Sequence, residues 1–258
     1  MIKFFRNIRK SLILEKSNNS KYIKYAIGEI VLVVIGILIA LQINNWNIDR
    51  IDRKNEDMIL LDLKVEFLEN LKDAERILIG NQEIYSAMSE IQNNIAQENY
   101  EQHELDSLMY YVFDWFDYTP KPGASNNLIN SGNLNIIQNK ELRKLLTLWS
   151  GVDAELDDDE AVAINYSHNI IVPFIAEHFP ISNLEKFDGS VDYYQRVQGK
   201  KFSYSEKLPY DSQALLINKT FQSHIAVKKI HAYHNAMECI TVIDTCRLIL
   251  DLIEDEIN

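Results

Sequence analysis

Ile30-Val-Leu-Val-Val-Ile-Gly-Ile-Leu-Ile-Ala-Leu41 is an unbroken run of apolar residues and glycine, and it decides how the whole chain is organised. No charged residue follows until after Trp46. Together with Tyr25 to Gly28, this uncharged stretch reaches about the 20 residues that a helix needs to cross a hydrocarbon core of about 30 Å. Aromatic residues stand at both of its ends, where membrane interfaces favour them. The sequence therefore predicts a transmembrane helix over residues 22–46.

Two other interpretations of this run exist. A cleaved signal peptide requires small residues at a cleavage site, whereas this run continues as Leu41-Gln-Ile-Asn-Asn-Trp46. We therefore expect an uncleaved signal anchor. A buried helix of a soluble protein is the other alternative, which is disfavoured because the run is apolar on all faces.

Basic residues are distributed unevenly around the predicted span. Three basic residues, Arg50, Arg53 and Lys54, follow it within about 15 residues. Seven lie before the apolar run that starts at Ile30: Lys3, Arg6, Arg9, Lys10, Lys16, Lys21 and Lys24. The positive-inside rule places the more basic side in the cytoplasm. We expect a single-pass protein of the cell inner membrane, with a cytoplasmic N-terminal leader (residues 1–21) and a periplasmic C-terminal domain.

The charge of that domain restricts its partners. The whole chain carries −12, while residues 1–46 carry seven basic and two acidic side chains, a net +5, which leaves −17 for residues 47–258. Binding to nucleic acid needs a basic face. We therefore expect no nucleic-acid partner and no attraction of the domain to anionic lipid.

Four residues of the span differ from what a passive anchor needs. Glu29 is either a carboxylate at headgroup depth, beside Lys24, or a contact to another membrane helix. Gly36 and Ala40 form a small-xxx-small pair, and Gly28 lies two turns earlier on a similar face. This pattern permits close helix packing, so we expect a homodimer or a membrane-protein partner as possible partners besides the lipid bilayer.

The segment Lys24-Tyr-Ala-Ile-Gly-Glu-Ile-Val-Leu-Val-Val-Ile-Gly-Ile-Leu-Ile-Ala-Leu-Gln-Ile-Asn-Asn-Trp-Asn47 resembles the N-terminal signature of a family of unknown function in Bacteroidota-type bacteria. The segments Leu128-Ile-Asn-Ser-Gly-Asn-Leu134 and Asn139-Lys-Glu-Leu-Arg143 are similar to a second recurring feature of that family. The resemblance implies a membrane location and an acidic helical domain. It implies no activity, since the family has none assigned.

Periodicity predicts that residues 47–258 fold as an all-α antiparallel helical bundle. A first helix is expected from Asn47 to Gly80, where the glycine should end it. Its apolar residues recur at helical spacing: Leu61, Val65, Leu68, and then Leu71, Ala74 and Leu78. Further helices are expected over residues 81–96, 104–118, 124–130, 139–178 and from 212 or 220 to 256. The long helix capped by Asn139 should kink near Pro173. Ile225, Ile230, Ile240, Ile243, Leu250 and Ile253 are the candidate core residues of the last helix.

One cluster has the residue types of a metal site. His231, His234 and Glu238 occur at i, i+3 and i+7, so a helix would place all three on one face. The alternative is that they are surface or core residues without a ligand, because no further ligand and no H-E-x-x-H spacing is present. Cys239 and Cys246 lie seven residues apart in one expected helix, too far for a disulfide, and should be buried thiols.

Other chemistry-bearing patterns point to structural roles. The acidic run from Asp157 to Glu160 lacks the glycine spacing of a cation-binding loop, which favours a solvated helix face. Ser131 precedes Gly132 without a nucleophile motif, which favours a helix-terminating turn. We find no P-loop, dinucleotide-binding or C-x-x-C motif, and the sequence predicts no cofactor.

The sequence therefore favours a non-enzymatic interaction or scaffold module in the cell envelope. A receptor-like sensor domain that binds a small molecule or an ion is the alternative, and it would need a separate cytoplasmic partner because the leader is short. A metal-dependent enzyme built on the histidine cluster is the least favoured function.

Overall fold

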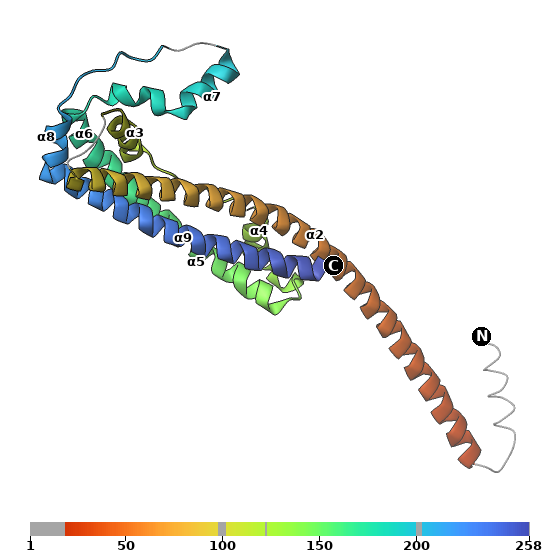
Figure 1. Cartoon of the computed structure of the whole chain (residues 1–258). Coiled ribbons are helices and arrows are strands. Elements are labelled where there is room, and N and C mark those ends of the chain that lie inside the picture. Colours follow the sequence, from red (N-terminus) through yellow and green to blue (C-terminus); the bar gives the residue numbers. More distant parts are fainter. Residues whose placement is uncertain (1–18, 98–101, 122, 200–202, 258) are drawn as a thin grey trace. The chain divides into compact units, whose positions relative to one another are not determined.

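The computed structural model describes residues 19–97, 102–121, 123–199 and 203–257, so the leader's basic residues from Lys3 to Lys16 lie outside the described ranges. The chain divides into two compact units, Met1–Asp57 and Met58–Asn258. Every regular element within the described ranges is helical, as the sequence predicts (Figure 1). The expected domain boundary after residue 46 stays a prediction, because one helix runs through it.

That helix is α2, which extends from Asn19 to Gln97. The prediction that Gly80 ends a helix is wrong, since α2 continues through it for another four turns and more. A Cβ at Gly80 would lie only 2.4 Å from the Phe116 ring. The absence of a side chain at Gly80 therefore leaves room for the Phe116 ring. This packing outweighs the low helix propensity of glycine.

Three short elements follow α2. The α3 helix extends from Gln102 to Phe113, so it stops five residues before the predicted end at residue 118. The predicted helix at residues 124–130 is confirmed as α4, Ala124–Asn130. Ser131 ends it as a turn residue, with its hydroxyl bonded to the Leu128 carbonyl, and Gly132 has a φ of 71°, a left-handed conformation that favours glycine. A 3-10 turn, η1, covers Asn133–Ile136.

The next helix is long and locally widened. The Asn139 side chain caps α5 (Lys140–Tyr166) by accepting the backbone N–H of Leu142 at 3.1 Å, which confirms the predicted cap. A π-helical turn, η2 (Ser167–Ile171), joins α5 to α6 (Val172–His178). Pro173 lacks an N–H and cannot continue a regular hydrogen-bond ladder, so the irregularity predicted near it takes the form of a π turn.

The remaining elements complete the second unit. They are the 3-10 helix η3 (Ile181–Phe187), α7 (Gly189–Gln198), α8 (Ser212–Ile217) and α9 (Lys219–Ile257). Asp211 caps α8 by accepting the N–H of Ala214 at 2.8 Å. Cys239 and Cys246 are buried thiols on α9 that form no disulfide with each other, as predicted.

Within the second unit, α2 and α9 lie side by side in opposite directions (Figure 1). Lys64 pairs with Glu254 at 2.9 Å, and Glu75 pairs with Arg247 at 2.8 Å. Further along α2, Lys229 donates to the Gln92 amide oxygen at 3.1 Å. The residue numbers rise on α2 as they fall on α9, which fixes the antiparallel direction. The α5 helix packs along α9 as well.

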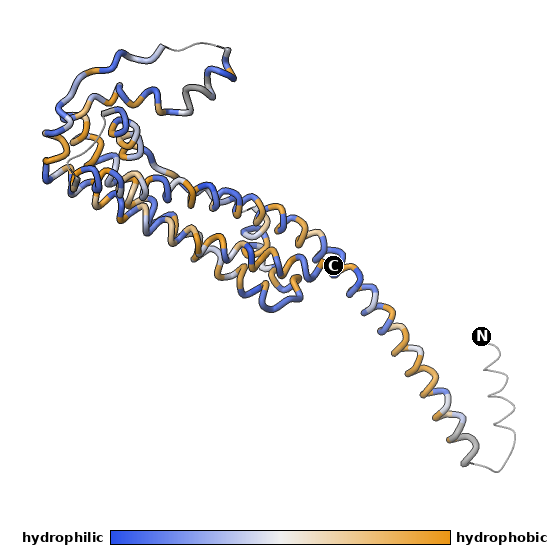
Figure 2. Tube along the Cα trace, viewed as in Figure 1, coloured by the Kyte–Doolittle hydropathy of each residue, from blue (hydrophilic) through white to orange (hydrophobic). Residues whose placement is uncertain are grey.

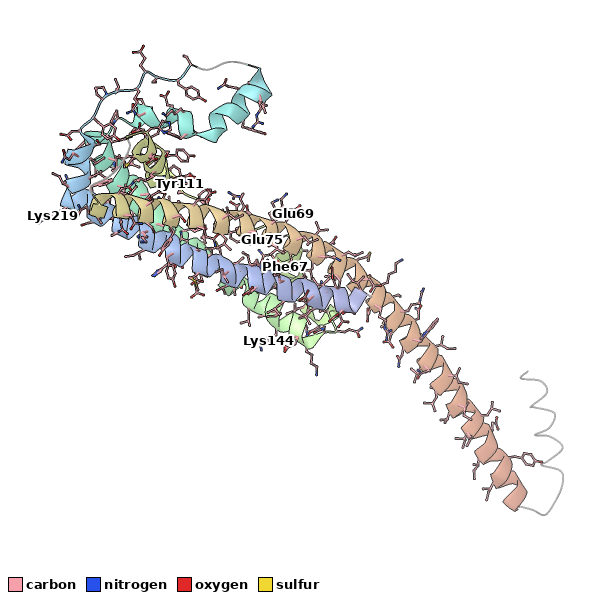
Figure 3. All side chains as sticks on the ribbon, viewed as in Figure 1. Phe67, Glu69, Glu75, Tyr111, Lys144 and Lys219 are labelled. Carbon is pink, nitrogen blue, oxygen red and sulfur yellow. The ribbon has the colours of Figure 1, made fainter. Side chains whose placement is uncertain are left out.

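Two hydrophobic clusters fill the space between these helices. One joins α2, α4, α5 and the C-terminal half of α9, and the fully buried Phe67 (labelled in Figure 3) meets Trp149 there with ring centroids 5.0 Å apart. The other joins the end of α2, α3, α6, α8 and the N-terminal half of α9. Both clusters draw on α2 and α9, so these two long helices are the common frame of the unit.

The first half of the apolar pattern expected on α2 does not face the core, whereas the second half does. Leu60, Leu63 and Phe67 are buried, while Leu61, Val65 and Leu68 are about half exposed. Further along, Ala74 is buried, and Leu71 and Leu78 pack against the core. Among the candidate core residues of the last helix, Ile225, Ile243, Leu250 and Ile253 are buried, but Ile230 and Ile240 are exposed. Both long helices therefore carry apolar residues on two faces, and the described part of the chain covers only one of them.

Candidate functional site

The four distinctive residues of the predicted span, Gly28, Glu29, Gly36 and Ala40, are all exposed. A Cβ added at Gly28 or Gly36 would meet nothing within 4 Å. Their surroundings in the chain therefore impose no small side chain at these two positions. The role predicted for the four residues, contact with another membrane helix, stays a prediction.

The surrounding part of α2 is apolar and uncovered. Its apolar window satisfies the length and composition of a membrane-crossing helix, and none of that window is buried within the chain. Figure 2 shows consecutive hydrophobic residues along this stretch. Trp46 is 65% exposed and Tyr25 is 62% exposed. Length and composition alone allow this helix to cross a membrane.

The residues of the predicted metal site lie on successive turns of α9. His231 is half-buried with its ring 5.8 Å from the Tyr166 ring, while His234 is exposed and Glu238 is half-buried. Within the part of the chain that the structure describes, no group of three or more His, Cys, Asp or Glu side chains is arranged to hold a metal ion. The observed contact of His231 is aromatic packing against α5.

A buried lysine that the sequence does not reveal lies one turn before His231. Lys228 Nζ donates to the backbone carbonyl of Asp114 at 2.7 Å and to Ser167 Oγ at 3.0 Å. Burial lowers the pKa of Lys228 to about 8, although the negative charge of Asp114 acts in the opposite direction and raises it. The lysine thus joins α9 to the segment after α3 and to the first residue of the π turn.

Lys228 and Ser167 have the spacing of a base and a nucleophile, but the arrangement is closed. Ser167 is 1% exposed and Lys228 is 5% exposed. The cavity beside them has a volume of about 20 Å³, room for about one water molecule. Asn235 Oδ1 is buried there and has no hydrogen-bond partner among the residues that the structure describes. In this conformation no substrate can reach the hydroxyl, so the contacts support the fold of the π turn.

Next to the Lys228–Ser167 contacts, aromatic and histidine side chains pack together between α5, α6 and the N-terminal part of α9. The Tyr166 hydroxyl lies 3.0 Å from His224 Nδ1, and the Phe174 ring packs edge-on against His224 at 5.0 Å. Burial lowers the pKa of His224. The ring therefore favours its neutral form, which can accept a hydrogen bond from the tyrosine.

A second polar arrangement fixes the loop between α3 and α4 onto α2. Glu66 accepts the backbone N–H groups of Ala124 and Ser125 as well as the Ser125 hydroxyl. Asn70 Oδ1 accepts the N–H of Lys121 at 2.9 Å, and Asp73 Oδ2 accepts the N–H of Thr119 at 3.1 Å. From the α5 side, Glu160 Oε2 accepts the N–H of Tyr118 at 2.8 Å. We call Glu66, Asn70, Asp73 and Glu160 the loop clamp.

Glu160 corrects one sequence-based expectation. The acidic run 157–160 was expected on a solvated face, but Glu160 is only 1% exposed, whereas Asp157 and Asp158 are exposed. Burial, together with repulsion from Asp117, Asp157 and Asp73, raises the pKa of Glu160 to about 7 despite the hydrogen bond from the Tyr118 backbone. The last residue of the run thus turns inward because the helix period separates it from its exposed neighbours.

Among the described residues of the second unit, each of the two long helices carries a row of exposed apolar side chains. The α2 seam consists of Met58, Leu61, Val65 and Leu68, and the α9 patch consists of Ile230, Tyr233, Met237 and Ile240. Each set repeats at spacings of three, four and three residues, which lines up its members on one helix face. Tyr85 of α2 adds to the α9 patch, because its ring centroid lies 6.3 Å from that of Tyr233.

Residues 29–150 match a family of unknown function (DUF6090). The match begins inside the predicted span and covers the uncovered helix, the α2 seam and the α2 side of the loop clamp. It ends within α5, before Glu160 and Lys228. No match was found among curated proteins. No match was found among solved structures either.

Sequence reasoning did not find the loop clamp or Lys228. The clamp had a weak signal: the spacing of Glu66, Asn70 and Asp73 repeats at four and three residues, so that three polar groups share one face of a helix. No sequence signal marked Lys228 as buried, because a lysine in an amphipathic helix is usually solvated.

Proposed function

We propose that this chain is a membrane-anchored, non-enzymatic interaction module of the cell envelope. Its apolar helix crosses the inner membrane once, and its acidic domain, an antiparallel helical bundle, binds a protein partner on the periplasmic side. The observation that carries this proposal is the helix itself, whose apolar window is uncovered on every face. Such a surface is stable in lipid and is too apolar to stay separate in water.

The direction of the anchor follows from charge. A basic leader suits the anionic cytoplasmic leaflet, and a domain of net −17 would be repelled from it. The interaction role is supported by the α9 patch. Tyr233 is 52% exposed and Met237 is 45% exposed. Tyrosine and methionine are enriched at protein interfaces and are costly to leave in water as a contiguous group.

The closed arrangement of Ser167 and Lys228 supports a role without catalysis. Among the described residues, the Ser167–Lys228 pair has the spacing of a nucleophile and its base, and the cavity beside it, about 20 Å³, is too small for a substrate or a metabolite.

The anchor is tested by membrane extraction and by charge insertion. The full chain should stay in the membrane pellet after alkaline carbonate extraction, whereas Val33→Arg with Ile37→Arg should release it, because each arginine costs about 2.5–3.5 kcal/mol at the centre of a span. A C-terminal alkaline phosphatase fusion should be active. Extraction of the unsubstituted chain by carbonate would overturn the anchor, and an inactive phosphatase with an active cytoplasmic reporter would overturn its direction.

The partner is tested with a photocrosslinking amino acid in place of Met237, in the full chain in native membranes. A discrete adduct with another envelope protein is expected. The same amino acid at Asp158, an exposed polar position on α5, is the control. Equal labelling at both positions, or none at Met237, would contradict binding through the α9 patch.

A further inference from the structure

We infer that the cavity beside Lys228 is a binding site for one ordered water molecule, which joins the Lys228 ammonium group to the Asn235 side chain as part of the folded chain. The inference goes beyond the proposed function. It depends neither on the membrane anchor nor on a protein partner, because every residue that lines the cavity belongs to the second unit.

The cavity lies where several parts of the chain meet. Its lining includes Asn81 of α2, Trp115 from the segment after α3, Ser167 of η2 and Asn235 of α9. Its volume of about 20 Å³ exceeds the roughly 10–15 Å³ that one water molecule needs. It is far below the volume of about 300 Å³ at which pockets for small molecules begin. Size therefore restricts the ligand to a molecule as small as water.

Two side chains in the lining have complementary hydrogen-bonding needs. Asn235 is 5% exposed, and its Oδ1 atom has no donor among the described residues. The Lys228 ammonium group has three N–H donors, and the Asp114 carbonyl and Ser167 Oγ accept two of them. The third N–H and the amide oxygen can both be satisfied by a molecule that accepts one hydrogen bond and donates another.

The chemistry of the lining selects water over other small ligands. A metal cation is disfavoured because it would lie beside the positive charge of Lys228. A halide ion cannot donate a hydrogen bond to Asn235 Oδ1. Protein cavities that stay dry are apolar, whereas an ammonium, a hydroxyl and an amide line this one. Leaving a buried acceptor unpaired also costs more free energy than holding one water molecule in place.

A crystal structure of the full chain, at a resolution that shows ordered water elsewhere in its core, tests the site directly. We expect a water molecule within about 3.2 Å of both Lys228 Nζ and Asn235 Oδ1. Electron density that shows no molecule in contact with both atoms overturns the inference. An anomalous peak in the cavity after a bromide soak would identify an anion site instead, which also overturns it.

Asn235→Leu tests the site in solution, because leucine has a similar size but no oxygen. In the full chain in detergent at about pH 7, this substitution should raise the equilibrium constant of unfolding by about tenfold, since the third N–H of Lys228 loses its partner. If the cavity is dry, the substitution removes an unpaired oxygen and should lower that constant. A lowered constant therefore overturns the inference.

The same substitution in a Lys228→Met background separates the loss of water from a poor fit of the leucine. The effect of Asn235→Leu on the unfolding constant should be smaller there by about fivefold or more, because the charged donor of the site is already absent. Asn165→Leu, at an exposed asparagine of α5, is the control and should act equally in both backgrounds. An equal effect of Asn235→Leu in both backgrounds overturns the inference.

Discussion

Glu66 Oε2 accepts the backbone N–H of Ser125 at 3.1 Å, across 59 positions of the sequence. The two carboxyl oxygens of this one side chain also accept the N–H of Ala124 and the hydroxyl of Ser125. They take up donors that a helix start leaves unpaired, so a residue of α2 caps α4. The loop clamp therefore orders a segment that has few hydrogen bonds of its own.

Replacement of Glu66 by alanine should lower the free energy of unfolding by about 3 kcal/mol, because several buried donors would lose their acceptor together. Thermal unfolding in detergent, followed by circular dichroism, measures the effect. Glu69→Ala is the control, since the ion pair of Glu69 with Lys121 is exposed and should contribute at most about 1 kcal/mol. A loss at Glu66 no larger than that at Glu69 would show that the cap contributes nothing.

Gly80→Ala should destabilise the chain by about 1–3 kcal/mol, although alanine favours helices by about 1 kcal/mol, because the new Cβ would overlap the Phe116 ring. Gly151→Ala should instead stabilise it by roughly 0.5–1 kcal/mol, since a Cβ there meets nothing within 4 Å. Combining Gly80→Ala with Phe116→Leu should recover part of the loss. If both glycine variants gain stability, the close approach of Phe116 has no energetic consequence.

The α-helical class, the apolar helix and the Asn139 cap are all visible in the sequence, because each depends on residues close together in the chain. The predictions that failed depend on contacts between residues far apart in the chain. Gly80 looked like a helix end because only tertiary packing against Phe116 explains its lack of a side chain. Leu61 and Val65 formed the clearer apolar period on α2, but which of two apolar faces turns inward is decided by α5 and α9. Glu160 was expected to be solvated because it ends an acidic run, and Asp157 and Asp158 of that run are indeed exposed.

Stability should depend on Lys228 at alkaline pH. The pKa of Lys228 is lowered by burial from 10.5 to about 8 in the folded chain. Between these values the unfolded chain holds a proton that the folded chain lacks, so this group makes the free energy of unfolding rise as pH increases from about 8 to about 10.5. Below about pH 8 both states are protonated, and the full cost of burying the charge remains.

Comparison with Lys228→Met isolates this effect. The unsubstituted chain should gain stability relative to the variant between about pH 8 and about pH 10, measured by denaturant unfolding in detergent. The comparison cancels other groups, including Tyr110, whose pKa burial raises to about 12. Lys229→Met serves as the control, because that lysine is only half-buried. Parallel curves for the chain and its Lys228 variant would contradict a proton-linked role.

Glu160 should give the opposite dependence. Burial raises its pKa from 4.5 to about 7, so between these values the folded chain holds a proton that the unfolded chain lacks. The contribution of this group is therefore fully present below about pH 4.5 and is lost as pH rises through about 7.

Glu160→Gln keeps an oxygen for the Tyr118 N–H and removes the buried charge. We expect Glu160→Gln to be more stable than the unsubstituted chain at about pH 8, with the difference shrinking toward about pH 5. Asp158→Asn, on the exposed side of the same helix, should show no comparable trend, and a difference for Glu160→Gln that is independent of pH would mean that the carboxyl group is not proton-linked to folding.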